Sequence, residues 1–226
     1  MGFMLLSERE NTILDFLVRD FIKTAEPVSS SKIREGLRLK ESPATIRNIV
    51  ADLDESGYLE QPHTSAGRVP TDMAYRYFVD NLMSEVELSR QISLRMKRLT
   101  LDREISRFLA ETLNLMGFSS VDEGHFDGHG LFRLLKNPEF KKEESVLDAG
   151  YFVDHINELA KIYGRQATKN TEIFIGKENP ARCAREFGVF YAESYGRGVK
   201  QITILVGPKR MNYELVSGYI NLFFDE

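Results

Sequence analysis

Apolar positions recur at helical spacing along the amino-terminal third of the chain, and short polar breaks separate them. Ser7 and Glu10 fit a capping box at the start of a first helix. The apolar face of that helix is then formed by Ile13, Leu14, Leu17, Val18 and Phe21. Ser29 and Ser30 are candidate caps for a short second helix, which continues to about Leu37.

A third helix and a strand pair follow this second helix. Ser42 is the expected cap, and Pro43 occupies the first helical position, where a missing N–H breaks no hydrogen bond. The inward face is Ile46, Ile49, Val50 and Leu53, and Gly57 ends the helix. Residues 58–61 alternate like a strand, the loop QPHTSAGRVPT at 61–71 turns the chain back, and Thr71 caps a fourth helix. This order of elements is typical of a winged helix-turn-helix.

The middle of the chain predicts one long helix and then a loop. Apolar residues keep helical spacing over residues 84–117 in two slightly rotated stripes, a pattern that suits a helix linking domains or pairing with a twin. Residues 117–130 read GFSSVDEGHFDGHG, and so many glycines and polar residues indicate a linker or an exposed loop.

The carboxy-terminal part mixes helices and strands. Helices are expected at 131–136, 146–163 and about 212–223, and strands at 172–176, 187–194 and 199–206, with a hairpin turn at YGRG. The fold class is therefore α+β. We divide the chain into a winged-helix domain, a linking or dimerisation helix and an α+β domain, at residues 1–83, 84–117 and 118–226.

Charge is distributed unevenly along the sequence. The 226 residues carry a net charge of −4, which argues against nonspecific binding to polyanions. Residues 30–47 nevertheless hold five basic residues against two acidic ones, and residues 90–107 hold six against two. A specific contact depends on the local field, so the first stretch suits nucleic acid. The second is better explained as the solvated face of a helix.

The outward face of the third helix carries side chains that can read bases. Arginine can bind guanine and asparagine can bind adenine through paired hydrogen bonds, while threonine and alanine can contact the thymine methyl group. We expect base contacts from Ala44, Thr45, Arg47 and Asn48. We expect phosphate or minor-groove contacts from Ser30, Ser31, Lys32, His63, Thr64, Ser65 and Arg68. Arg68 is expected to be exposed at the tip of the turn, with no acid nearby to neutralise it. An ordinary solvated helix and turn would show the same residue types.

Several longer motifs resemble those of one bacterial family. The segments LSERE, EPVSSSKI and SPATIRNIVADLDESGYLEQPHTSAGRVPTDMAYRYFVD closely resemble the heat-inducible transcription repressor HrcA family. IFIGKENP, ITILVGPKRMNY and LKNPEF resemble elements of that family's GAF-like domain. The resemblance is strongest over residues 5–83 and weaker over 118–170.

The resemblance implies a repressor of chaperone operons that binds double-stranded DNA, an inverted-repeat operator called CIRCE, as a homodimer. It also implies the chaperonin GroEL as a partner that keeps the repressor active. The family is built from a winged helix, a GAF-like domain and an inserted dimerising domain. This chain is shorter before IFIGKENP, so the inserted domain is reduced or missing. Ile49 stands where the family usually has an acid, and Ser31 where it tends to have a basic residue.

Other classes of site find little support. No nucleophile with a base and no nucleotide-binding motif occurs, so we expect no enzyme and no cofactor. Histidines and acids at 122–129 suit a solvated loop better than a metal site, and Cys183 suits a buried position better than a reactive one. We expect a cytoplasmic protein, because no signal peptide or membrane span is evident. Two alternatives to a repressor remain open: a regulator whose GAF-like domain binds a small molecule, and a module that binds another protein.

Overall fold

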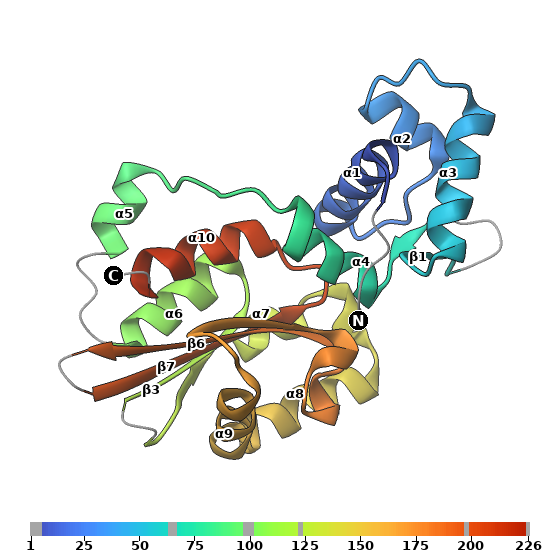
Figure 1. Cartoon of the computed structure of the whole chain (residues 1–226). Helices are drawn as coiled ribbons and strands as arrows, with labels where there is room; N and C mark the ends of the chain where they lie inside the picture. Colours follow the sequence, from blue (N-terminus) through green and yellow to red (C-terminus); the bar gives the residue numbers. More distant parts are fainter. Residues whose placement is uncertain (1–5, 63–66, 97–101, 122–123, 197–198, 225–226) are drawn as a thin grey trace. The chain divides into compact units, whose positions relative to one another are not determined.

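The computed structural model describes residues 6–62, 67–96, 102–121, 124–196 and 199–224 (Figure 1). The chain divides into two compact units, Met1–Ser84 and Glu85–Glu226. Within the described residues, no helix is both long and apolar enough to cross a bilayer.

Three capped helices begin the first unit. They are α1 (Glu8–Thr24), α2 (Ser30–Gly36) and α3 (Pro43–Glu55). Ser7 and Glu10 form the predicted capping box, and the hydroxyls of Ser29 and Ser42 accept backbone N–H groups at the starts of α2 and α3. These caps confirm the predicted helix starts, because a cap satisfies N–H groups that the helix itself leaves unpaired.

A small hairpin follows α3. Strands β1 (Leu59–Glu60) and β2 (Val69–Pro70) pair antiparallel, and Thr71 caps α4 (Asp72–Tyr77), which continues as a π-helical turn, Phe78–Leu82. The fully buried side chains of the first unit include Leu14, Leu17, Ile33, Tyr58 and Phe78, which come from its helices and its hairpin region.

The second unit is built on a five-stranded antiparallel sheet in the order β4-β3-β7-β6-β5. The strands are β3 (Met116–Val121), β4 (Asp127–His129), β5 (Thr171–Ile175), β6 (Phe187–Gly196) and β7 (Val199–Pro208). The longest pairing joins β6 to β7, from Phe187 opposite Pro208 to Gly196 opposite Val199. This is the hairpin that the sequence predicted around YGRG.

Helices cover both faces of this sheet (Figure 1). On one face lie α6 (Asp102–Leu113) and α10 (Tyr213–Phe224), where Ser106 contacts Ser119 and Tyr213 stacks on Phe190. On the other lie α8 (Glu143–Asp154) and α9 (Ile156–Gln166). The remaining helical segments are α5 (Arg90–Met96), α7 (Leu131–Leu135) and three short 3-10 turns, Pro138–Lys141, Gly176–Glu178 and Arg182–Ala184. The second unit therefore has three layers, and the predicted α+β class is confirmed.

Three predictions for residues 84–163 are wrong. Residues 84–117 do not form one helix, because α6 ends at Leu113, Asn114 adopts a left-handed conformation with φ 60°, and Met116 already belongs to β3. The glycine-rich stretch that we interpreted as a linker instead contributes β3 and the edge strand β4. Gly128 fits there because a Cβ atom would lie only 2.8 Å from the ring of Phe118. The helix expected at 146–163 is likewise divided at His155 into α8 and α9.

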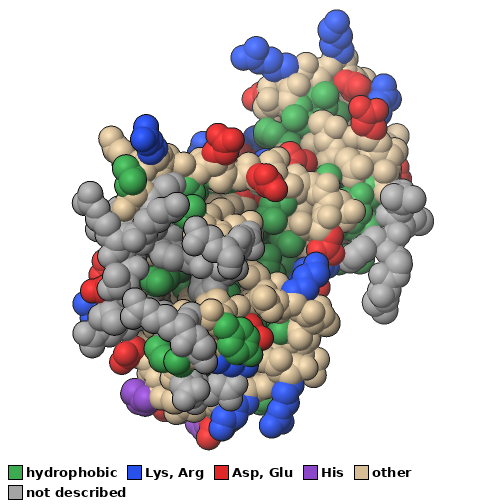
Figure 2. Space-filling view, turned by 60° about the vertical axis from the view of Figure 1, so that its left-hand side comes forward, with side chains coloured by type: hydrophobic (Ala, Val, Ile, Leu, Met, Phe, Trp, Pro, Cys, Tyr) green, Lys and Arg blue, Asp and Glu red, His purple; other side chains and the backbone are tan. Residues whose placement is uncertain are grey.

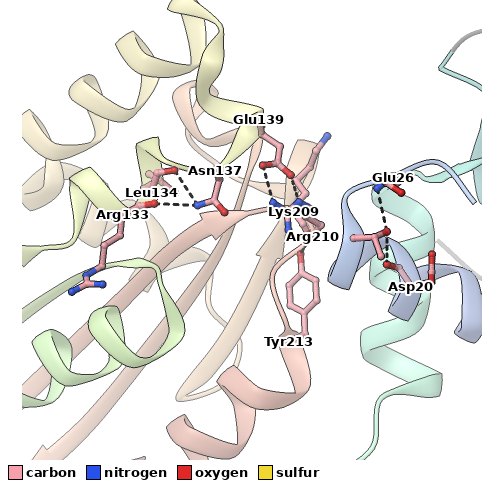
Figure 3. A network of polar contacts seen from close by, with 10 residues as sticks. Asp20, Glu26, Arg133, Leu134, Asn137, Glu139, Lys209, Arg210 and Tyr213 are labelled. Atoms are coloured by element: carbon pink, nitrogen blue, oxygen red, sulfur yellow. Dashed lines mark hydrogen bonds and ion pairs between the residues drawn. The ribbon is translucent and has the colours of Figure 1, made fainter.

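Two of the motifs that carried the resemblance meet in the second unit. Glu139, from LKNPEF, forms an ion pair with Arg210, from GPKRMNY (Figure 3). Tyr213 donates its hydroxyl hydrogen to the carbonyl oxygen of Lys209, and Lys209 lies 3.3 Å from Glu186. The two ion pairs join segments that are distant in the sequence, whereas the Tyr213 hydrogen bond spans only four residues.

Candidate nucleic-acid interface

The outward face of α3 is open to solvent, as the sequence predicted. Ala44, Arg47, Asn48 and Ala51 are exposed, whereas Ile46, Val50 and Leu53 on the opposite face are buried. Packing of the buried face fixes the helix, so Arg47 and Asn48 are presented next to each other from a rigid element.

Thr45 differs from its neighbours on this face. Its side chain is half-buried, its N–H donates to the Ser42 hydroxyl at 3.2 Å, and the two hydroxyl oxygens lie 2.9 Å apart. The hydroxyl of Thr45 thus belongs to the cap of α3.

The start of α2 is also tied into the unit. Ser30 is half-buried, and the Ser31 hydroxyl lies 2.9 Å from that of Ser29. The ammonium nitrogen of Lys32 lies 2.7 Å from a carboxylate oxygen of Asp20 on α1. The cation that we expected to hold a phosphate is therefore already paired within the protein.

Arg68 corrects a second expectation. It is half-buried instead of exposed at a loop tip, and its Nε donates to Asp54 Oδ2 of α3 at 2.6 Å. The prediction that no acid would neutralise it is wrong, because Asp54 is separated from it by 14 positions and only the fold brings the two together. His63, Thr64 and Ser65 lie outside the described residues.

Other cations of the first unit remain open to solvent. Among the ion pairs of the described residues, none involves Arg34, Arg38, Lys40 or Arg47, and all four side chains are exposed. Figure 2 shows Lys and Arg side chains standing out from the end of the first unit where the α2–α3 turn lies. Arg38 adopts a left-handed backbone conformation with φ 50°, which is uncommon for residues other than glycine, asparagine and aspartate. Arg34, Arg38 and Lys40 belong to the basic stretch at residues 30–47, and the sequence alone indicates no particular contact for them.

Cys183 and the acidic and histidine residues at 122–129 are the other candidate sites of the second unit. Cys183 is buried, and burial together with the nearby Asp148 raises the pKa of its thiol to about 11, so the buried position that we favoured is confirmed. Within the described part of the chain, no three or more His, Cys, Asp or Glu side chains gather as a metal site. Asp122 and Glu123 of the candidate metal cluster lie outside the described residues.

Comparison with known proteins gives one consistent family. Residues 72–216 match the family model described as the HrcA protein C terminal domain. The heat-inducible transcription repressor HrcA of Symbiobacterium thermophilum is 48% identical over 120 residues, which cover 49% of this chain and 35% of the relative. The protein of the same name from Desulforamulus reducens is 40% identical over 139 residues, which cover 62% of this chain and 38% of the relative.

The matches to the two curated relatives cover only part of each protein. The chain spans little more than a third of the length of these curated relatives. One solved structure is similar to this chain, a crystal structure of a hypothetical protein at 2.2 Å resolution. The similarity covers 97% of this chain and 98% of the chain in that structure, with a TM-score of 0.73 and a sequence identity of 18%. At that identity the likeness concerns the fold alone.

Proposed function

This chain belongs to the HrcA family, and from that premise we propose that it is a sequence-specific DNA-binding repressor of heat-shock chaperone operons. We propose that two copies bind one inverted-repeat operator of the CIRCE type in the cytoplasm, and that the chaperonin GroEL is a further partner. The family's curated members carry the name of a transcription repressor and not that of an enzyme.

The first unit supplies the DNA-binding part of this proposal. We interpret α2 and α3 with the β1–β2 hairpin as a winged helix-turn-helix, whose second helix enters the major groove. The second unit, which contains most of the matched HrcA C-terminal domain, then acts as the GAF-like domain.

The observation that carries the proposal is the exposed pair Arg47 and Asn48 on a helix whose opposite face is buried. Arginine binds guanine O6 and N7, and asparagine binds adenine N6 and N7, so the two side chains can recognise adjacent bases. Ala44 lies one helical turn before Asn48 and offers a methyl group to thymine. Among the described residues, the side chains of Arg47 and Asn48 have no internal partner that DNA would have to displace.

The exposed cations around the α2–α3 turn supply the sequence-independent part of binding. Arg34, Arg38 and Lys40 are exposed and lie in or just after α2, where the helix-turn-helix faces the DNA backbone. Each cation that neutralises a phosphate releases counterions, so affinity should fall as salt rises.

Fluorescence anisotropy with two labelled duplexes tests this function. One duplex carries the inverted repeat, and the other contains the same bases in scrambled order at the same salt concentration. The proposal predicts clearly tighter binding to the inverted repeat and a complex containing two protein copies. Equal affinity for both duplexes would contradict it. Arg165→Ala, a change at an exposed arginine of α9, provides a control that should bind like the wild type.

A further inference from the structure

The hairpin of the first unit is joined to the turn before α2 by its backbone. Arg68 donates its N–H to the carbonyl of Val28 and accepts the N–H of Val28 through its own carbonyl, both at 2.9 Å. Gly67 makes this approach possible, because a Cβ atom there would lie 2.3 Å from the Val28 oxygen and 2.8 Å from the Ser29 nitrogen. Such contacts with backbone atoms cannot be relieved by turning a side chain.

The side chain of Arg68 joins the same point to a third segment. Its Nε lies 2.6 Å from Asp54, whose side chain is 30% exposed, while that of Arg68 is 23% exposed. Asp54 is the penultimate residue of α3, about two helical turns beyond Arg47. Arg68 directly precedes β2. Its backbone contacts the α1–α2 turn, and its side chain contacts the carboxy-terminal end of α3.

The charge of this arginine is already balanced. An ion pair is neutral as a whole, so placing it beside a phosphate releases no net counterion and adds nothing to the salt dependence of binding. A phosphate that bound Arg68 would have to lie close to the Asp54 carboxylate, which already accepts the Nε hydrogen and would repel the phosphate.

We infer that Arg68 is a positioning residue that fixes the hairpin relative to α3, and that the Asp54–Arg68 pair is needed for operator affinity although Arg68 binds no phosphate. This inference rests on the proposed DNA-binding function and deepens it. It assigns Asp54, an acidic residue beside a DNA-binding surface, a favourable effect on DNA binding. The electrostatic expectation for an isolated acid is the opposite, because it repels phosphate.

The test measures operator and scrambled-duplex affinities at several salt concentrations for Arg68→Ala, Asp54→Asn, Asp54→Glu and the double variant Arg68→Ala/Asp54→Asn. A positioning role predicts that both single neutralising changes weaken operator binding by about three- to tenfold without changing the salt slope. The double variant should be no weaker than Arg68→Ala, and Asp54→Glu, which keeps the charge, should stay close to the wild type. Circular dichroism and thermal unfolding show whether each variant is folded at the assay temperature.

The opposite pattern identifies a phosphate ligand. Asp54→Asn would then release Arg68 to the DNA, so affinity would rise or stay constant, and Arg68→Ala would reduce the salt slope by about one contact. That result overturns the inference while leaving the proposed function intact. Failure of the wild type to distinguish operator from scrambled duplex overturns the proposed function and this inference together.

Discussion

The ammonium nitrogen of Lys32 on α2 lies 2.7 Å from a carboxylate oxygen of Asp20 on α1. The Asp20 side chain is only 15% exposed, so the pair joins two helices near the protein interior. A residue that the sequence places beside the DNA thus contributes first to the structure of the first unit.

Lys32→Ala should therefore act mainly on stability. Removing the cation leaves Asp20 unpaired in a poorly hydrated position, and we expect the free energy of unfolding to fall by about 1 kcal/mol. Urea denaturation measures this change. The slope of log affinity against log salt concentration should remain that of the wild type for operator binding. A slope smaller by about 0.9, the contribution of one phosphate contact, would show that Lys32 binds phosphate after all.

Lys40→Ala and Arg38→Ala should show the reverse behaviour. Both side chains are exposed and take part in no ion pair found among the described residues, so their loss should leave the unfolding free energy nearly unchanged. Each cation that contacts a phosphate contributes about 0.9 to the slope of log affinity against log salt concentration. We expect each change to weaken operator and scrambled duplex equally and to reduce that slope. A loss confined to the operator would assign the residue to base reading instead.

Two glycine-to-alanine changes should have opposite effects on stability. In Gly67→Ala the new methyl group would lie 2.3 Å from the Val28 carbonyl oxygen, and we expect a loss of about 1–3 kcal/mol. Gly150→Ala places the methyl group on α8, where no atom other than those of the adjacent residues and the helix's own backbone lies within 4 Å, and alanine should stabilise the helix by about 0.5–1 kcal/mol. Thermal unfolding measures whether each variant is less or more stable than the wild type. A Gly67→Ala variant as stable as the wild type would contradict the close packing of Gly67 against Val28.

Cys183 should react slowly and should make stability depend on alkaline pH. Because burial raises the pKa of its thiol from 9.0 to about 11, little thiolate exists at pH 8, and an aromatic disulfide reagent should label the native protein far more slowly than the denatured one. The unfolded thiol ionises first, so stability should decline as pH rises from about 9 towards 11. A Cys183→Ala variant should lack this decline, and rapid labelling of the native wild type would show that the thiol is accessible.

Local chemistry explains why much of the first unit was predictable. Ser7, Ser29, Ser42 and Thr71 each cap a helix through an N–H within three residues, so the sequence alone contains both partners. The inward face of α3 follows from helical spacing for the same reason. The exposure of Arg47 and Asn48 was then a consequence of the residues opposite them.

Partners distant in sequence explain what could not be predicted. Arg68 gains Asp54, and Lys32 gains Asp20, only when separate helices pack, and no spacing rule connects such residues. The strand β3 was missed because its short run of residues 116–121 includes serines, which usually suggest a loop. Ser119 is buried there through its contact with Ser106, and β4 exists only as its hydrogen-bonded neighbour at the edge of the sheet.

The central claim is that Arg47 and its neighbour Asn48 read bases. Its most direct test uses fluorescence anisotropy at one salt concentration. For the wild type and for Arg47→Ala, it measures the ratio of operator affinity to scrambled-duplex affinity. A lost base contact of about 1–3 kcal/mol predicts that this ratio falls by about five- to 150-fold. An unchanged ratio in a folded Arg47→Ala protein would contradict the account.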